Sequence, residues 1–265
     1  MRVGALPVFI SMTKDLEGAD LTHMYVDTHK DSAGNLDPLV TTGSGNLADP
    51  IEIALEMEWR KPDGSLASHE EIAADWNAIK QWGRDNPELV LRGGNTSAQK
   101  AITTLRLDRT ALDRIFNARL QQNETLIRPL APQYDQWPAS AQIGINSMAW
   151  AMGVGNVATF HKFLAACNVF DFDTAAKEAH ISNANANRNT DDHELFAEAA
   201  EVMRRGLNFE LVFFPNTVAS GILNAGQTIA TAALTSPGIA TGIGLGTVAI
   251  ATTLGLLIAK YWPWK

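Results

Sequence analysis

The sequence contains a single cysteine among its 265 residues, and it is short of positive charge. One cysteine, Cys167, excludes an intramolecular disulfide, so the fold does not depend on an oxidising compartment. Cys167 lies in an apolar helical run, which favours a core residue over a reactive thiol. Lysine and arginine number 21 against 29 acidic residues, which gives a net charge of −8. An acidic chain gains little from a phosphate backbone, so nucleic acid is not an expected ligand.

Several motifs that would indicate a particular chemistry are also missing. The N-terminus has one positive charge and a short apolar run without an Ala-x-Ala-like cleavage site, so no signal peptide is expected. His23 and His29 follow no zinc-ligand spacing, and we expect both to be exposed on a hairpin. Gly43-Ser44-Gly45 lacks the lysine and the following helix of a phosphate loop. Neither a metal nor a cofactor is therefore predicted.

The distribution of charge divides the chain into two parts. All acidic residues and all but two basic residues precede Leu211, and residues 211–259 carry no charge. We therefore predict a folded domain over residues 1–210 and an apolar, Gly/Ala-rich tail over residues 211–265. Residues 237–259 form a mostly apolar stretch close to the ~20 residues that a membrane-spanning helix needs. The alternative for this stretch is a buried helix packed on the folded domain.

Residues 1–210 are predicted to form an α+β fold that is mainly helical and contains one small β-hairpin. Gly18 is expected to end a first helix over residues 12–19. Between residues 24 and 47, turn-forming residues punctuate β-branched ones, which predicts a hairpin with a wide loop. Apolar spacing and capping residues predict further helices at 50–59, from a cap at Ser68 through 82, at 110–121, 140–152, 157–169 and 173–181, and from a cap at Thr190 through 204.

Two carboxylates and a hydroxyl follow one another near the start of the chain. Glu17 falls near the end of the first predicted helix, Asp27 comes ten positions later, and Thr41 follows fourteen further on. Glycosidases need two carboxyl groups across a cleft, one to protonate the leaving oxygen and one to handle water or the sugar cation. A helix end that faces a hairpin is one way to build such a cleft. Asp20 and Asp31 are rivals of Asp27 for the second carboxylate.

These residues resemble a known family. Leu16-Glu17-Gly18, Tyr25-Val26-Asp27 and Thr41-Thr42-Gly43-Ser44-Gly45 are similar to the Glu–Asp–Thr triad of phage-type lysozymes, glycoside hydrolase family 24, and their pesticin-like relatives. The stretch 142–153 resembles the buried helix of that family, and Asn187-Arg188 resembles an Asn-Arg step that opens one of its late helices. The matches occur in the order of the family and span residues 1–206. The resemblance implies a lysozyme-like fold with a hairpin lobe and a helical lobe.

The resemblance also implies roles for three catalytic residues. Glu17 would be the general acid, for which it should be partly buried with a raised pKa. Asp27 would stay ionised and orient the attacking water, and Thr41 would hold that water by a hydrogen bond. The choice of Thr41 over Thr42 depends on the register of the hairpin, because a slip of one residue turns a side chain to the other face.

The function expected from these residues is a muramidase. It would cleave the β-1,4 bond between N-acetylmuramic acid and N-acetylglucosamine in peptidoglycan, without a cofactor. Expected partners are peptidoglycan, the membrane through the tail, and an immunity protein or secretion carrier. We expect synthesis in the cytoplasm and action on the cell wall in the periplasm, close to the membrane, as a phage endolysin or an antibacterial effector such as one of type VI secretion. The alternative is a pore-forming toxin whose tail inserts while the front domain binds or delivers; dye release from liposomes would distinguish it.

Overall fold

The computed structural model describes residues 1–17, 21–28, 36–91, 96–182, 184 and 186–213. The chain divides into two compact units, Met1–Glu210 and Leu211–Lys265. None of the helices in the described part of the chain is both long enough and apolar enough to cross a membrane. The predicted span over residues 237–259 lies outside the described residues.

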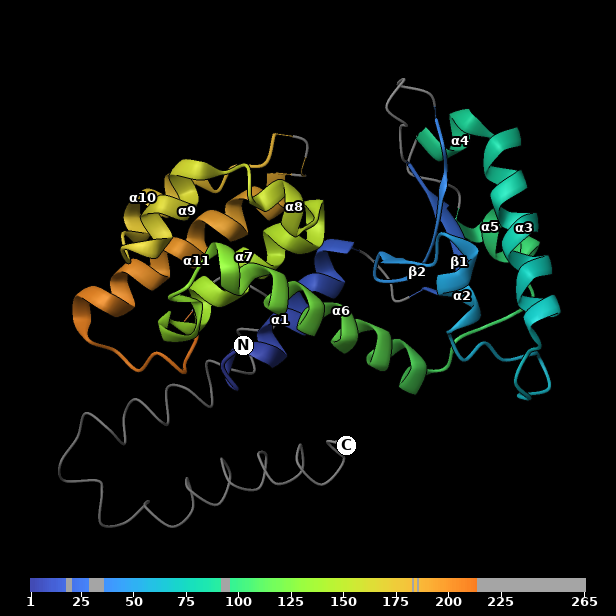
Figure 1. The fold of residues 1–265 in the computed structure, drawn as a ribbon, viewed down its shortest axis with the longest axis horizontal. Helices are drawn as coiled ribbons and strands as arrows, with labels where there is room; N and C mark the ends of the chain where they lie inside the picture. The colour runs from blue at the N-terminus through green and yellow to red at the C-terminus, as the bar shows by residue number, and fades with distance from the viewer. Residues whose placement is uncertain (18–20, 29–35, 92–95, 183, 185, 214–265) are drawn as a thin grey trace, which may run out of the picture. The chain divides into compact units, whose positions relative to one another are not determined.

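The first unit is mainly helical and contains one small antiparallel sheet (Figure 1), as the α+β prediction requires. Its first half consists of α1 (Ala5–Glu17), β1 (Leu21–Asp27), β2 (Leu39–Gly43), β3 (Asn46–Leu47), α2 (Ile51–Leu55), α3 (His69–Asp85), α4 (Pro87–Leu91) and α5 (Thr96–Ile102). Its second half consists of α6 (Arg109–Leu130), the 3-10 helix η1 (Tyr134–Gln136), α7 (Ala139–Met152), α8 (Val154–Val157), α9 (His161–Asn168), α10 (Phe172–Glu178) and α11 (Ala186–Arg205).

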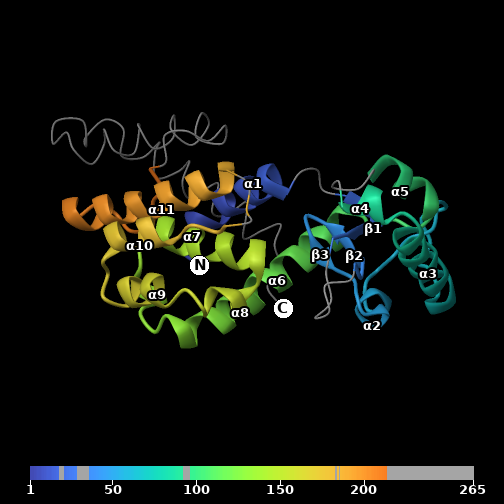
Figure 2. The same cartoon turned by 90° about the horizontal axis from the view of Figure 1, so that it is seen from above.

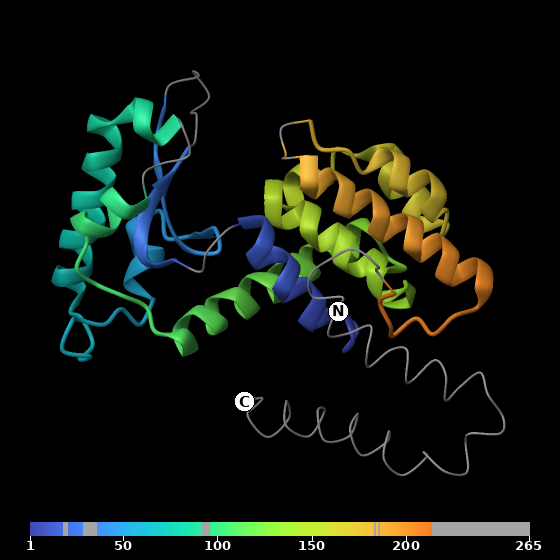
Figure 3. The same cartoon turned by 180° about the vertical axis from the view of Figure 1, so that it is seen from behind.

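The sheet has the strand order β1-β2-β3, and one of its faces packs against a hydrophobic core. Val26 of β1 lies opposite Val40 of β2, and both belong to a hydrophobic core that also contains Ile72 and Ile79 of α3. Figure 3 shows α3 beside the sheet on this side. The buried side chain of Gln99 in α5 accepts from the Val26 backbone nitrogen at 2.6 Å. Burial of apolar side chains and paired backbone groups therefore fixes the position of β1.

The second core surrounds α7. Every residue of this helix from Ala139 to Trp150 is buried, and the helix contacts α1, α6, α8 and α11 (Figure 2). A side chain at Gly144 would approach the ring of Phe196 in α11 to 2.7 Å, so glycine is needed for the close contact between α7 and α11. Two polar side chains of this buried helix are bonded inside the core: Gln142 Nε2 donates to the Tyr134 carbonyl and Asn146 Nδ2 donates to the Tyr134 hydroxyl, both at 2.9 Å.

Two of the predicted helices match the structure closely. Ser68 caps α3 as predicted: its hydroxyl accepts from the Glu71 backbone nitrogen at 3.3 Å, and the Glu71 carboxylate accepts from the Ser68 backbone nitrogen at 2.7 Å. The helix predicted at 140–152 is α7, which begins one residue earlier. The first segment carries a local signal, the capping box of Ser68 and Glu71, and the second was identified through the resemblance of residues 142–153 to a buried helix.

Other predictions of helix ends were wrong. The first helix begins at Ala5, not at residue 12, and α6 continues to Leu130 with Pro129 in its last turn, where proline removes one helical hydrogen bond without ending the helix. The helix predicted at 157–169 is divided into α8 and α9. Thr190 is not a cap; α11 begins at Ala186, and the Thr190 hydroxyl donates to the Ala186 carbonyl at 3.0 Å. The short helices α4 and α5 were not predicted.

The expectation that His23 is exposed was also wrong, because its side chain is buried. The chain after α5 covers β1 at this point, and the Leu107 backbone nitrogen donates to the Thr22 carbonyl at 2.7 Å. His29 lies outside the described residues. Among the described residues, no group of three or more His, Cys, Asp or Glu side chains is arranged to hold a metal ion. Cys167 is a buried core residue, and burial raises the pKa of its thiol.

Candidate active site

Glu17 is the last residue of α1, and the packing of that helix fixes its position. The buried residues of α1 recur at helical spacing, and Glu17 continues the face that carries Thr13. Phe9 anchors this face, with its ring centroid 5.9 Å from that of Phe116 in α6 and 5.7 Å from that of Trp150 in α7. The Glu17 carboxyl therefore stands at the end of a helix that two aromatic contacts hold in place.

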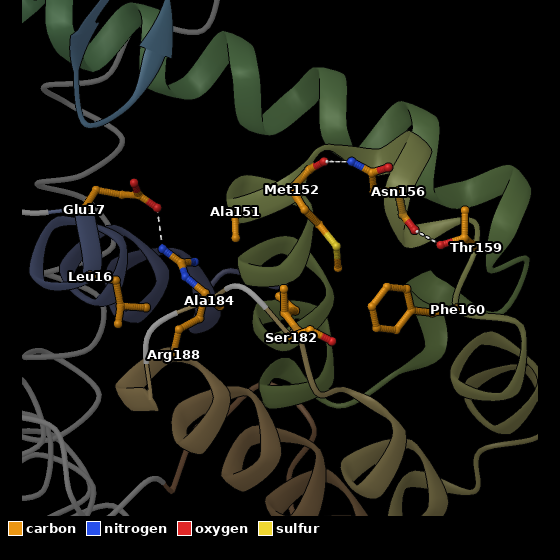
Figure 4. Close-up of a pocket in the computed structure, with 11 residues that line it drawn as sticks. Leu16, Glu17, Ala151, Met152, Asn156, Thr159, Phe160, Ser182, Ala184 and Arg188 are labelled. Atoms are coloured by element: carbon orange, nitrogen blue, oxygen red, sulfur yellow. Dashed lines mark hydrogen bonds and ion pairs between the residues drawn. The ribbon is translucent and has the colours of Figure 1, made fainter. Parts of the chain in front are cut away.

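The carboxyl of Glu17 is partly buried and faces two arginines. Its side chain is 23% exposed, and it accepts a hydrogen bond from Nη2 of Arg188 (Figure 4). Burial raises the pKa of Glu17, while the charges of Arg188 and Arg119 oppose the rise and the charge of Asp27 adds to it. The burial is the larger effect, so Glu17 holds its proton to a higher pH than an ordinary glutamate.

Arg188 is fixed from two sides. It lies in the first turns of α11, and its side chain is 5% exposed. Its Nη1 donates to both the backbone carbonyl and the hydroxyl of Ser147 in α7, at 3.1 and 3.2 Å, while Nη2 reaches Glu17. Asn187-Arg188 was singled out in the sequence for its place in a family pattern, and the structure shows the ion pair that this arginine makes with Glu17.

The sheet presents a second carboxylate and a hydroxyl on one face. Tyr25 lies directly opposite Thr41, and Asp27 is two residues beyond Tyr25 on β1. Residues two apart on a strand, and residues opposite each other on paired strands, point to the same face. Tyr25, Asp27 and Thr41 therefore share the face turned away from the Val26–Val40 core. Asp27 is exposed, and the electrostatic influence of its carboxylate reaches both Glu17 and Tyr25.

The register separates the two candidate threonines. The Thr41 hydroxyl donates to the Tyr25 carbonyl at 3.3 Å, on the face that carries Asp27. Thr42 points to the opposite face, where it is fully buried and its hydroxyl lies 3.3 Å from the Leu21 carbonyl and 3.2 Å from that of His23. Of the two threonines, only Thr41 lies on the face of the sheet that carries Asp27.

The turn between β2 and β3 packs directly against Glu17. Gly45 has a φ of 75°, and a Cβ atom built there would lie 3.3 Å from Oε2 of Glu17. The Gly45 backbone nitrogen donates to the Tyr25 hydroxyl at 3.2 Å, and the carbonyl of the residue before it, Ser44, accepts from Trp150 Nε1 at 3.0 Å. Glycine is thus required at position 45 both by its backbone conformation and by the carboxyl beside it.

Arg119 of α6 is a site residue that the sequence did not reveal. Its Nη1 donates to the Gly45 carbonyl at 2.6 Å, its Nη2 donates to the Trp150 carbonyl at 2.7 Å, and its guanidinium stacks 4.1 Å from the Trp150 ring. Burial lowers the pKa of Arg119 to about 10, against the attraction of Glu17. The sequence does contain a signal for this residue. Position 119 lies three residues after Phe116 and four after Ile115, so an arginine occupies the apolar face of the helix.

A pocket of about 560 Å³ opens beside the Glu17–Arg188 pair (Figure 4). Its other walls come from the end of α7, from α8, and from the segments before α9 and α11. The residues of these walls carry no charge: Ala151, Met152, Asn156, Thr159, Phe160, Ile181, Ser182 and Ala184, to which α1 adds Leu16 beside Glu17. The pocket therefore combines one ion pair with apolar, amide and hydroxyl groups, which suits an uncharged polar ligand.

No protein-family model matches this chain, and no curated protein matches it in sequence. The case for a function therefore rests on the side chains around Glu17. They form one arrangement from segments far apart in the sequence: the end of α1, one face of β1 and β2, the middle of α6 and the start of α11.

Proposed function

We propose that the first unit is a glycoside hydrolase with Glu17 as its general acid. The observation that carries this proposal is the position of the Glu17 carboxyl, partly buried with a raised pKa and close enough to the Asp27 carboxylate to feel its charge. A general acid has to hold a proton near neutral pH, and desolvation is the usual means of raising a glutamate to that range. Most glycoside hydrolases use two carboxyl groups that flank the scissile bond, one as the acid and one to act on the water or the sugar.

Within that class, we propose a muramidase that cleaves the β-1,4 bond between N-acetylmuramic acid and N-acetylglucosamine in peptidoglycan. The resemblance of the segments around Glu17, Asp27 and Thr41 to phage-type lysozymes supports this substrate. The pocket beside Glu17 offers a space next to the proposed acid, with Asn156, Thr159 and the Phe160 ring in its wall, while Asp27 and Thr41 are not part of its lining. An enzyme with this substrate would act in the periplasm.

The geometry divides the reaction among the site residues. Glu17 would protonate the glycosidic oxygen, and the nearby Arg119 and Arg188 would stabilise the carboxylate that remains. The Asp27 carboxylate would accept a hydrogen bond from the attacking water. The Thr41 hydroxyl donates its proton to the Tyr25 carbonyl, so its oxygen is left to accept a second hydrogen bond from that water. Attack by water from the face opposite the leaving group inverts the anomeric centre.

Purified sacculi from Gram-negative cells test the proposed bond specificity. The full-length protein should clear a suspension of sacculi and create new reducing ends that are N-acetylmuramic acid after borohydride reduction. New ends consisting of N-acetylglucosamine would instead indicate a glucosaminidase. Clearing without any new reducing end would indicate cleavage of the peptide part, and it would remove the glycosidase proposal.

Paired threonine substitutions test the role of the hydroxyl. Thr41→Val is expected to lower the rate of sacculus hydrolysis about 100-fold, at the lower end of what positioned hydrogen-bonding groups contribute. Thr42→Val removes the same atoms from the other face of β2 and should cost about 1 kcal/mol of stability through its lost hydrogen bonds. Its rate per folded molecule should stay within a few-fold of wild type. Rates measured with equal amounts of folded protein check the pair, and equal losses in both variants would contradict the assignment.

Two glycine substitutions test the contact between the β2–β3 turn and Glu17. Gly45→Ala and Gly64→Ala both place a side chain at positive φ, 75° and 84°, which costs about 1–2 kcal/mol in each case. The new methyl group meets Oε2 of Glu17 at position 45, but it has no neighbour within 4 Å at position 64. Both variants should therefore melt earlier, and only Gly45→Ala should lose most of its hydrolytic rate. A loss of rate in Gly64→Ala of similar size would show that backbone strain alone is responsible.

A further inference from the structure

Asp192 is a buried acidic residue that the proposed reaction does not use. It lies on α11 one helical turn after Arg188, and it is completely shielded from solvent. Within the described residues, neither of its carboxyl oxygens completes a hydrogen bond. An ionised carboxyl in such a place is costly unless a positive charge or donor balances it. The position of Asp192 beside Arg188 is therefore a feature that needs a physical reason.

One hydroxyl group lies between Asp192 and the active site. Ser147 of α7 accepts a hydrogen bond through its Oγ from Nη1 of Arg188, at 3.2 Å. The same side chain approaches Asp192 closely enough to lower the pKa of its carboxyl, as a hydrogen-bond donor does. A serine hydroxyl accepts and donates at the same time. Hydrogen bonds thus run from Glu17 through Arg188 to Ser147, and Asp192, whose own oxygens complete no hydrogen bond within the described residues, lies one helical turn after Arg188 beside this series.

The remaining charged groups around Asp192 are few. On α11, Asp191 opposes ionisation of Asp192, and Arg188 favours it. The packed helix α7 has no charged residue between Ala139 and Met152. On α10 the charged residues are Asp173, which is engaged with Arg204 at the far end of α11, Lys177 and Glu178. Arg188 is the cation whose charge lowers the pKa values of both Glu17 and Asp192.

We propose that Asp192 is a positioning residue, an inference that rests on the proposed function. Asp192 and Glu17 share Arg188, and Asp192 is the second counter-ion of this arginine. When Glu17 carries the proton that a general acid needs, the buried guanidinium loses its negative partner on that side. An ionised Asp192 supplies the missing charge and keeps Arg188 in place. Because one cation serves two carboxyls, the two titrate together, and a negative charge on Asp192 helps Glu17 to keep its proton.

The titration behaviour of both groups is consistent with this arrangement. Burial raises the pKa of Asp192 to about 7, against the opposing effects of Ser147 and Arg188. Burial also raises the pKa of Glu17, with Arg188 as the largest opposing charge. Both carboxyls therefore change charge above the range of ordinary acidic residues, where each can influence the other.

The substitution Asp192→Asn in the full-length protein tests the proposal. It keeps the shape of the side chain and removes its charge, so Arg188 acts on Glu17 alone and the Glu17 pKa should fall by about one unit. The titration of Glu17, followed by NMR of carbon-13-labelled glutamate carboxyls and assigned with Glu17→Gln, measures this directly. In sacculus hydrolysis, the alkaline limb of the pH–rate profile should move to lower pH by the same amount, because that limb reports deprotonation of the acid.

Asp191→Asn is the matched control. It removes the same charge from the next residue of α11, away from the contact with Ser147, and it should move the Glu17 pKa by clearly less. A purely structural role for Asp192 would lower the rate equally at every pH and leave the limb in place, which would overturn the proposal. An equal shift in both variants would overturn it as well, because a through-space effect would then suffice.

The experiments distinguish failure of the Asp192 proposal from failure of the muramidase proposal. The Glu17 titration needs no substrate, so a shift in Asp192→Asn supports the inference even if sacculi are not cleared. Clearing by wild type together with an unchanged Glu17 pKa in the variant overturns the inference and leaves the muramidase proposal standing. If Asp192→Asn does not fold, Ser147→Ala replaces it: loss of the hydroxyl disfavours ionised Asp192, so the Glu17 pKa should again fall. An unchanged pKa in that variant would overturn the inference.

Discussion

Glu17→Gln should reduce hydrolysis of sacculi by about 10³-fold, the loss expected when a general acid cannot donate its proton. Glutamine keeps the size of the side chain and an oxygen that accepts from Nη2 of Arg188, so the site should keep its geometry. The variant should also be no less stable than wild type near neutral pH. The pKa of Glu17 is raised in the folded protein, so the contribution of this side chain to stability is complete below pH 4.5, the ordinary value of a glutamate. That contribution is lost as the pH rises through the pKa of Glu17 in the folded state.

Three measurements check this expectation. Sacculus clearing gives the rate, circular dichroism and thermal melting at pH 4 and pH 8 establish the fold, and Asp15→Asn serves as the control. Asp15 is an exposed carboxylate on the same helix, two residues before Glu17, so this control changes net charge equally without touching the site. Wild-type clearing by Glu17→Gln would remove Glu17 from the mechanism. A melting temperature that falls relative to wild type as the pH rises would contradict the raised pKa.

The residues that sequence alone could place are those governed by local rules. Ser68 and Glu71 form a capping box within four residues, and the apolar run of α7 indicates its burial without reference to any partner. The order of Glu17, Asp27 and Thr41 was also visible, because all three lie within one short helix–hairpin segment. Their placement on a common face required the register, which the pairing of Tyr25 with Thr41 supplies.

The partners of Glu17 were beyond the reach of local rules. Arg188 is 171 positions away in the sequence, and the helical spacing of Arg119 from the apolar residues of α6 marks this arginine without identifying its partner. Asp192 would lie in the first turn of the helix that was predicted to follow a cap at Thr190. The helix begins four residues earlier, because the side chain of Asn189 instead bonds the backbone of Ile181 in the preceding loop, accepting at 2.7 Å and donating at 2.9 Å. That shift turns an exposed first-turn acid into a buried one.

Arg188→Met should have the largest effect on stability and should change the acidity of Glu17 in the opposite direction to Asp192→Asn. Removal of one member of a buried ion pair leaves uncompensated charge, and we expect a loss of about 3 kcal/mol in the free energy of unfolding. The loss of stability should stay near this value because Glu17 and Asp192 can both take up protons and so avoid remaining as uncompensated buried charges. Urea unfolding at pH 7 measures it, with Arg204→Met as the control. Arg204 lies on the same helix in exposed ion pairs, which contribute less than about 1 kcal/mol.

The same substitution tests the electrostatic account of the active site. Arg188 is the largest influence that lowers the pKa of Glu17, so its removal should raise that pKa further and move the alkaline limb of the pH–rate profile to higher pH. The rate itself should fall, because a weaker acid donates its proton less readily and the carboxylate left behind loses its partner. Opposite shifts in Arg188→Met and Asp192→Asn are expected when one cation serves two carboxyls, and the Asp191→Asn control separates this arrangement from a general effect of nearby charge. General loosening of the site would instead move the alkaline limb of the pH–rate profile in the same direction in both variants.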